Sequence, residues 1–273
     1  MGDRMKYAFS TLAAPEWTLE QAVERGRTMG YDGVELRLID GELIPPDFSA
    51  AAIHRVRKAT VDAGFPVLAV DTSVRVTEPD TDKARDDILA YVDMAAVWAA
   101  PVVRVFGGSL PDDAAGREDT MARAASLLSS VAGSAAARGV TVAVETHDDF
   151  AASKVVAELL ARVPEPSIGA VWDSHHPYRM GETAEEVDAN LADRLALAQV
   201  KDAQRDDFES SGWKLVLLGE GEVPVRRLTE LAAGRGLDWI SVEWEKKWHP
   251  DIEPPEEALP QHLAVLREWE AGK

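Results

Sequence analysis

Short runs rich in β-branched and other apolar residues alternate along this chain with longer amphipathic segments. Eight such runs are recognisable, and a stretch long enough for a helix follows each one. They are Tyr7–Leu12, Gly33–Leu38, Val67–Ser73, Val102–Phe106, Thr141–Thr146, Ile168–Trp172, Leu197–Lys201 and Ile240–Trp244. Parallel strands need a long crossover, which a helix supplies, so the alternation predicts a parallel sheet built from βα units.

Local start and stop signals support several of the intervening helices. Thr18-Leu19-Glu20-Gln21 has the form of a capping box, and Gly30 ends the helix that this box opens. Apolar residues recur at spacings of three and four over Asp86–Ala99, and this pattern stops before Pro101. Further helices are predicted at Thr120–Ala137, Val223–Ala233 and Glu256–Trp269.

Eight βα units predict an α/β fold in which the whole chain, residues 1–273, forms a single (β/α)₈ TIM barrel. The alternative is an open doubly wound sheet, which usually carries a glycine-rich phosphate loop after its first strand. That position reads Thr11-Leu12-Ala13-Ala14-Pro15, so the dinucleotide fingerprint is missing. No linker or low-complexity segment divides the chain.

Composition narrows the classes of partner. The chain carries 48 acidic and 29 basic residues, a formal net charge of −19, which argues against nucleic acid as a partner. It has no cysteine, which excludes disulfides, thiolate metal ligands and a cysteine nucleophile. Neither a signal-like apolar run after Met1 nor a stretch long enough to span a bilayer is present, so we expect a cytoplasmic protein without a membrane partner.

Four polar residues end successive strands in the second half of the chain. In barrels of this class the chemistry lies at the carboxyl ends of the strands. The spacing from Glu145 to Asp173 is 28 residues and from Asp173 to Gln199 is 26, which matches one βα unit each; Glu243 follows after a longer loop, Ala203–Gly221. Three converging carboxylates repel each other unless a cation neutralises them. The spacing therefore predicts that these four residues bind a divalent metal.

The oxygen-rich ligand set suits Mn²⁺ best, and Mg²⁺ or Co²⁺ also fit it. A simpler interpretation stays open, in which the strand-end carboxylates cap neighbouring helices or pair with Arg37, Arg104 and Lys201. A single strand-end carboxylate would favour that interpretation. Four polar residues at equivalent positions of different strands favour a metal site.

Several segments at the strand ends resemble a known superfamily. These segments are Glu145-Thr146-His147, Trp172-Asp173-Ser174-His175-His176-Pro177, Val200-Lys201-Asp202, Gly219-Glu220-Gly221-Glu222 and Ser241-Val242-Glu243-Trp244-Glu245. They resemble the xylose isomerase-like TIM-barrel superfamily, which holds sugar and sugar-phosphate isomerases and epimerases, inosose dehydratases and a nuclease branch. The resemblance runs from about Tyr7 to Trp269.

The resemblance implies roles for particular residues. Glu145, Asp173 and Glu243 match the metal-binding carboxylates of the family, and His176 matches a histidine that lies against the substrate. Gln199 stands where many members have a histidine ligand. A glutamine carbonyl oxygen can still bind a hard cation, but it biases the site away from zinc.

The resemblance also implies a reaction, namely metal-dependent isomerisation or epimerisation of a sugar or sugar phosphate. A proton is removed next to a carbonyl held on the metal, with Glu145 and Glu243 as the acid–base pair. The expected partner is a small carbohydrate, and we expect a homo-oligomer. The expected substrate contacts come from the loops that follow the strands Ile168–Trp172 and Ile240–Trp244 and from basic residues at the carboxyl ends of other strands. They are His176, Arg179, Lys201, Arg104, Lys246 and Trp248.

His147 opens a rival interpretation. It lies two residues after Glu145, so strand alternation places both side chains on one face. An imidazole there can act as the base of a β-elimination on a keto-sugar, as in inosose dehydratase-like enzymes or the catalytic subunits of C-glycoside deglycosidases. The latter resemblance would imply a second, small subunit. A non-catalytic sugar-binding barrel also stays open, whereas a nuclease would need more histidines and a basic groove.

Overall fold

Eight parallel strands close into a barrel in the computed structural model of the protein, which describes residues 4–272. The order around the barrel is β1-β12-β9-β8-β7-β6-β5-β2. The strands are β1 (Lys6–Ser10), β2 (Gly33–Leu36), β5 (Val67–Arg75), β6 (Val102–Phe106), β7 (Thr141–Glu145), β8 (Ile168–Asp173), β9 (Leu195–Val200) and β12 (Trp239–Val242). The predicted (β/α)₈ barrel is therefore confirmed, and the open-sheet alternative is wrong.

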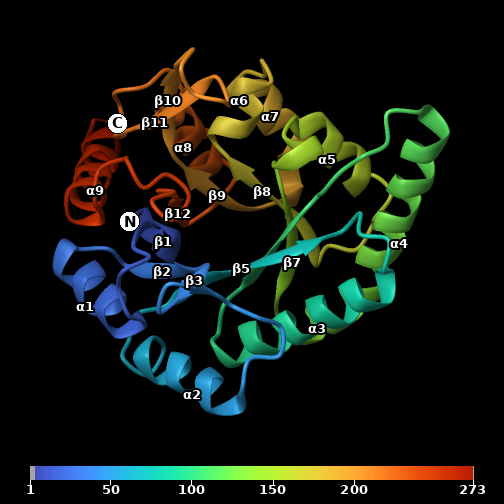
Figure 1. The fold of residues 1–273 in the computed structure, drawn as a ribbon, viewed down its shortest axis with the longest axis horizontal. Helices are drawn as coiled ribbons and strands as arrows, with labels where there is room; N and C mark the ends of the chain where they lie inside the picture. Colours follow the sequence, from blue (N-terminus) through green and yellow to red (C-terminus); the bar gives the residue numbers. More distant parts are fainter. Residues whose placement is uncertain (1–3, 273) are drawn as a thin grey trace.

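Helices surround the barrel on its outer side, and the two termini lie close to each other (Figure 1). No helix among residues 4–272 is both long and apolar enough to cross a bilayer. The helices are α1 (Leu19–Met29), α2 (Ala50–Ala59), α3 (Thr81–Val97), α4 (Ala114–Ala137), α5 (Ser153–Leu160), α6 (His175–Arg179), α7 (Ala184–Leu191), α8 (Val225–Gly234) and α9 (Pro255–Ala271).

Helix boundaries follow capping more closely than apolar periodicity. The capping box at Thr18 is confirmed, and Gly30 ends α1 in the left-handed conformation at φ 96°. The predicted starts of α3 and α4 were too late. Asp80 caps α3 and Asp113 caps α4, each by accepting a hydrogen bond from a backbone N–H three residues on. The first turns of these helices contain no large apolar residue, so they show no apolar periodicity.

Two antiparallel hairpins lie outside the barrel, and the sequence pattern did not reveal them. One pairs β3 (Leu38–Ile39) with β4 (Glu42–Leu43), and the other pairs β10 (Asp202–Arg205) with β11 (Trp213–Val216). The second lies within the segment expected to be a plain loop. The Asp202 carboxylate closes its base by accepting hydrogen bonds from four backbone N–H groups, those of Ala203, Gly219, Gly221 and Val223.

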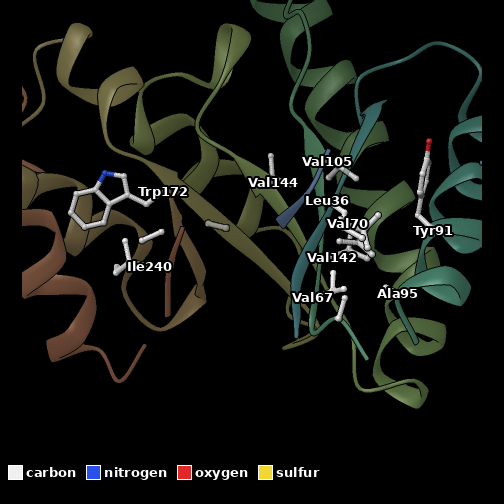
Figure 2. Close-up of a cluster of buried hydrophobic side chains, with 14 of the residues drawn as sticks. Leu36, Val67, Val70, Tyr91, Ala95, Val105, Val142, Val144, Trp172 and Ile240 are labelled. Atoms are coloured by element: carbon white, nitrogen blue, oxygen red, sulfur yellow. The ribbon is translucent and has the colours of Figure 1, made fainter. Parts of the chain in front are cut away.

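The hydrophobic core has two parts because strand side chains alternate between faces. The larger part lies between the strands and the helices. Figure 2 shows strand residues such as Val70 and Val142 near Tyr91 and Ala95 of α3. The smaller part comprises Ala8, Leu68, Ala69, Val102, Ala143, Val171 and Leu197.

On most strands, a charged or polar residue lies two positions after the residue that belongs to the smaller part of the core. Since residues two apart on a strand share a face, the same face that is apolar below is polar at the carboxyl end of the barrel. The pairs are Ala69 and Asp71, Val102 and Arg104, Ala143 and Glu145, Val171 and Asp173, and Leu197 and Gln199; all the polar members are buried.

Candidate functional site

Three buried carboxylates meet at the carboxyl end of the barrel. Glu145, Asp173 and Glu243 each place a carboxylate oxygen within 4.8 Å of the other two. We call these three residues the acidic cluster. Gln199 is fully buried and its amide nitrogen lies 3.5 Å from Glu243 Oε1. The structure therefore brings together the four strand-end residues that the sequence spacing singled out.

The side chain of Gln199 is held in one orientation by carboxylates on its nitrogen side. Its Nε2 donates a hydrogen bond of 2.5 Å to Glu35 Oε1, in addition to the longer contact with Glu243. Its carbonyl oxygen is buried and accepts no hydrogen bond. An oxygen left without a donor in a buried acidic site is suited to a cation.

Lys201 supplies the nearest positive charge. Its Nζ lies 2.8 Å from Glu243 Oε2 and 3.1 Å from Asp173 Oδ2, and it also contacts the Glu245 carboxylate. Although burial disfavours the charged ammonium, these three carboxylates raise the pKa of Lys201 well above its usual value. Lys201 therefore neutralises part of the acidic cluster in the metal-free protein.

The other half of the polar layer holds two carboxyl groups and two guanidinium groups, all buried. Glu35 and Asp71 lie there with Arg37 and Arg104, and we call these four residues the paired cluster. Arg104 Nε lies 3.7 Å from Asp71 Oδ1 and 3.0 Å from Glu145 Oε2, so it also reaches the acidic cluster. The Arg37 guanidinium donates to the Asp71 carbonyl oxygen.

Burial makes ionisation of these carboxyl groups costly. It raises the pKa of Glu145 to about 7, with added repulsion from Glu243 and Asp173 and an opposing effect of Arg104. Burial also raises the pKa of Glu243 and, together with Asp71, raises that of Glu35 well above its usual range. A bound cation would favour the charged form of these buried carboxyl groups.

The donors of the acidic cluster fit a divalent cation. Glu145 Oε2, Asp173 Oδ2 and Gln199 Oε1 are buried, and none accepts a well-oriented hydrogen bond. The first two make only ion-pair contacts, with Arg104 and Lys201. A ligand set made of oxygen atoms favours a hard cation such as Mn²⁺ or Mg²⁺ over zinc.

Two histidines flank the acidic cluster. The rings of His147 and His176 are 4.5 Å apart, and one nitrogen of each lies within 4.8 Å of a Glu145 oxygen. Asp173 Oδ1 accepts hydrogen bonds of 2.9 Å from the backbone N–H groups of His175 and His176, at the start of α6. Burial and the nearby Lys201 lower the pKa of His176 well below its usual value, so this imidazole is neutral.

The remaining residues expected to touch substrate are placed differently. Arg179 is half-buried on α6, and its charge contributes to the low pKa of His176 after burial and the other neighbouring charges. Lys246 donates to carbonyl oxygens of its own loop, at Pro250 and Ile252, and Trp248 is 49% exposed. No hydrogen bond or ion pair found within residues 4–272 joins Lys246 or Trp248 to the acidic cluster. Their contact with substrate stays a prediction.

Four residues of the site were not among the predicted ones. Glu35 and Asp71 are strand-end polar residues on β2 and β5, so the rule that found Glu145 applies equally to them. Glu245 lies two residues after Glu243, which signals the same face. Asp148 adjoins His147, and its 2.8 Å contact with the ring has no sequence signal beyond that adjacency.

A (β/α)₈ barrel with carboxylates gathered at the carboxyl ends of its strands defines a class of candidate metal-dependent barrel proteins. The chain belongs to the xylose isomerase-like TIM barrel family, whose model matches residues 23–269. The family resemblance read from the strand-end motifs is thereby confirmed. Among curated protein sequences, none matches this chain.

Solved structures with the same fold include enzymes of more than one kind. The IOLI protein with a bound zinc atom is 17% identical (TM-score 0.78, covering 98% of this chain and 99% of that one). D-allulose 3-epimerase from Methylomonas sp. is 14% identical (TM-score 0.76, 98% and 99%). The probable 3-DHS dehydratase AsbF from Bacillus anthracis is 16% identical (TM-score 0.76, 96% and 99%). At these identities the likeness shows the fold alone.

Proposed function

We propose that this protein is a divalent-metal-dependent enzyme that isomerises or epimerises a sugar or sugar phosphate by moving a proton next to a carbonyl group. The observation that carries the proposal is the acidic cluster, in which three buried carboxylates converge with an amide oxygen that accepts no hydrogen bond. Glu145, Asp173, Gln199 and Glu243 would hold the cation. When bound, it would polarise the carbonyl of the substrate and so acidify the neighbouring C–H group.

Glu145 and Glu243 are the proposed acid–base pair. Burial raises the pKa of both groups, and for Glu145 it reaches about 7, close to the optimum for exchanging protons at neutral pH. Glu243 shares Lys201 with Asp173 and Glu245, and Glu145 shares Arg104 with Asp71. This arrangement supports a reaction in which one carboxylate takes the proton and the other returns it.

Lys201 and Arg104 act in this proposal mainly by setting the charge of the carboxylates. Both side chains are at least 98% buried and engaged in ion pairs, so a substrate would meet them only at their edges. His176, in the first turn of α6 and beside Glu145, and Arg179, the last residue of that helix, are the proposed contacts for substrate hydroxyl or phosphate groups. The fold shared with a D-allulose 3-epimerase is compatible with this chemistry.

A lyase is the second candidate, and one specific observation favours it. His147 Nδ1 lies 2.8 Å from Asp148 Oδ1, an arrangement in which a carboxylate orients an imidazole base. Such a base can drive β-elimination from a keto-sugar in place of returning the proton. The fold shared with a probable dehydratase is compatible with this outcome as well.

The test incubates Mn²⁺-loaded protein in D₂O with a panel of ketoses, ketose phosphates, inososes and 3-keto-glycosides, and follows each by NMR. Deuterium at one carbon with altered configuration or carbonyl position identifies an isomerase or epimerase. Loss of water or of an aglycone identifies a lyase. If no compound on the panel exchanges a proton or reacts, the proposed chemistry is contradicted.

Glu145→Gln and Glu243→Gln should each lower exchange by about 100- to 10,000-fold, the usual contribution of a general acid or base. Glu118→Gln is the matched control, because Glu118 is an exposed glutamate on α4 that pairs with Arg162, just after α5. Circular dichroism should show all three variants folded. Full activity in either cluster variant would show that the acid–base pair lies elsewhere.

A further inference from the structure

Asp148 has a backbone conformation that L residues rarely adopt. It follows β7 at the start of a short 3₁₀ turn, Asp148–Phe150, and has φ 51°. Residues in this left-handed region persist where surrounding structure holds them, and such positions concentrate at functional sites. Asp148 lies three residues after Glu145, directly beside the acidic cluster.

The contacts of Asp148 point to the imidazole that precedes it. Its Oδ1 lies 2.8 Å from Nδ1 of His147, and its Oδ2 lies 3.7 Å from the Arg75 guanidinium. The His147 ring is further fixed by its neighbours, since Phe106 packs 4.7 Å away and His176 4.5 Å away between ring centroids. The ring is only partly buried, with 33% of the side chain exposed, so it remains accessible from the mouth of the barrel.

We propose that Asp148 is a positioning residue that accepts the Nδ1–H of His147 and thereby leaves Nε2 as the free, proton-accepting nitrogen at the acidic cluster. A carboxylate can only accept a hydrogen bond, so it selects the neutral tautomer that carries its proton on Nδ1. The unusual φ of Asp148 turns its carboxylate back onto the ring of the preceding residue. This inference rests on the second candidate function, the lyase, in one respect, namely that His147 takes part in proton transfer.

The positioned imidazole has a defined chemical use. Nε2 accepts the proton of a C–H bond next to a carbonyl, and the electron pair of that bond moves toward the carbonyl. In an elimination, the carbonyl then re-forms, a carbon–carbon double bond forms next to it, and the hydroxyl or aglycone oxygen departs with the electron pair of its own bond to carbon and takes the proton from the imidazolium. The Asp148 carboxylate stabilises the imidazolium that exists between these two steps.

Two variants separate this role from a purely conformational one. Glycine adopts a positive φ at no steric cost, and asparagine tolerates it better than other residues do. Asp148→Gly and Asp148→Asn should therefore fold and melt at or above the temperature of the original protein. Both lose the acceptor-only carboxylate, and an asparagine amide can donate to Nδ1 instead.

The experiment records long-range ¹H–¹⁵N NMR spectra of the full chain, labelled with ¹⁵N-histidine, metal-free and at alkaline pH. The His147 signals are assigned by their loss in His147→Gln. We expect the Nδ1–H tautomer in the original protein and its loss or mixing with Nε2–H in both Asp148 variants. Asp149→Asn, at the exposed neighbouring aspartate, should leave the tautomer unchanged. An unaltered Nδ1–H tautomer in both Asp148 variants would overturn the proposal.

The tautomer of His147 and the reaction of the protein are measured separately. With a substrate from the D₂O panel, Asp148→Asn should lower the exchange or elimination rate by about 100- to 10,000-fold, since an orienting carboxylate acts through the base that it holds. An original protein that shows the expected tautomer but reacts with nothing on the panel would contradict the proposed function alone. Full activity in Asp148→Asn would contradict the positioning role.

Discussion

The two halves of the polar layer contain the same kinds of side chain in different proportions. The paired cluster holds two carboxyl groups, Glu35 and Asp71, and two guanidinium groups. The acidic cluster and the adjoining Glu245 hold four carboxyl groups, whose nearby cations are Lys201 and, at Glu145, Arg104 of the paired cluster. Both halves are buried at the carboxyl end of one barrel. Position and residue type alone therefore do not distinguish a structural ion-pair network from a cation site.

The difference lies in the charge balance. A buried carboxylate with its own counter-ion is already neutralised by the chain, while a surplus of carboxylates needs a cation from outside. A hydrogen bond from Gln199 to Glu35 and the ion pair of Arg104 with Glu145 join the two halves. The paired cluster thus holds a ligand of the neighbouring half in place, which is a role that its own charge balance does not reveal.

Removing Arg104 should have the largest effect on folding. Arg104→Met leaves Asp71 and Glu145 buried without their counter-charge, so we expect a loss of about 3–5 kcal/mol in the free energy of unfolding. Urea denaturation of the metal-free protein measures it. Arg227→Met is the control, because Arg227 makes a similar 2.8 Å ion pair with Glu185 at the exposed surface and should change stability little. Equal effects of the two substitutions would remove the distinction between buried and exposed pairs.

Acid should weaken cation binding at the acidic cluster. The pKa of Glu145 in the folded chain is about 7, above its ordinary value of 4.5. Between pH 4.5 and about pH 7, the metal-free fold therefore keeps a proton on Glu145, and a cation must displace it. The apparent affinity for Mn²⁺ should fall about tenfold per pH unit below pH 7. Because this proton stabilises the metal-free fold, its contribution to the free energy of unfolding is lost as the pH rises through about 7. Calorimetric titration with Mn²⁺ at several pH values measures the slope, and a flat profile would contradict it.

Loss of the hydrogen bond from Gln199 to Glu35 should have a smaller effect, on the affinity for Mn²⁺. Glu35→Leu removes the acceptor that fixes the Gln199 amide and should weaken Mn²⁺ binding by about 10- to 100-fold, as is usual for groups that orient a metal ligand. Glu35→Gln retains an oxygen acceptor and should restore most of the affinity. If both variants bind Mn²⁺ like the original protein, Gln199 either is not a ligand or does not depend on Glu35.

Much of the barrel is readable from the sequence because both of its patterns are local. Strand and helix periodicities alternate at the length of one βα unit, and the strand-end spacing from Glu145 to Gln199 repeats that length. All eight strand regions and the meeting of the four strand ends were therefore predictable. The first turns of α3 and α4 were missed because capping aspartates, and not apolar residues, mark them.

The features that the sequence did not predict depend on contacts between residues far apart in the sequence and on backbone conformation. Pairing of the strand-end carboxylates with Lys201 was one interpretation that the sequence left open, but the sequence did not say that Asp173, Glu243 and Glu245 together surround its ammonium group. The bond from Gln199 to Glu35 joins residues 164 positions apart. The positive φ of Asp148 is equally invisible, since aspartate adopts that conformation only in particular settings.

Anomalous X-ray scattering from a crystal soaked with Mn²⁺ locates the cation without reference to any substrate. We predict a peak bounded by the carboxylates of Glu145, Asp173 and Glu243 and by the carbonyl oxygen of Gln199, and loss of that peak in Glu243→Gln. A peak at the neighbouring group of Glu145, His147 and His176 instead, or no peak at this end of the barrel, would contradict this prediction.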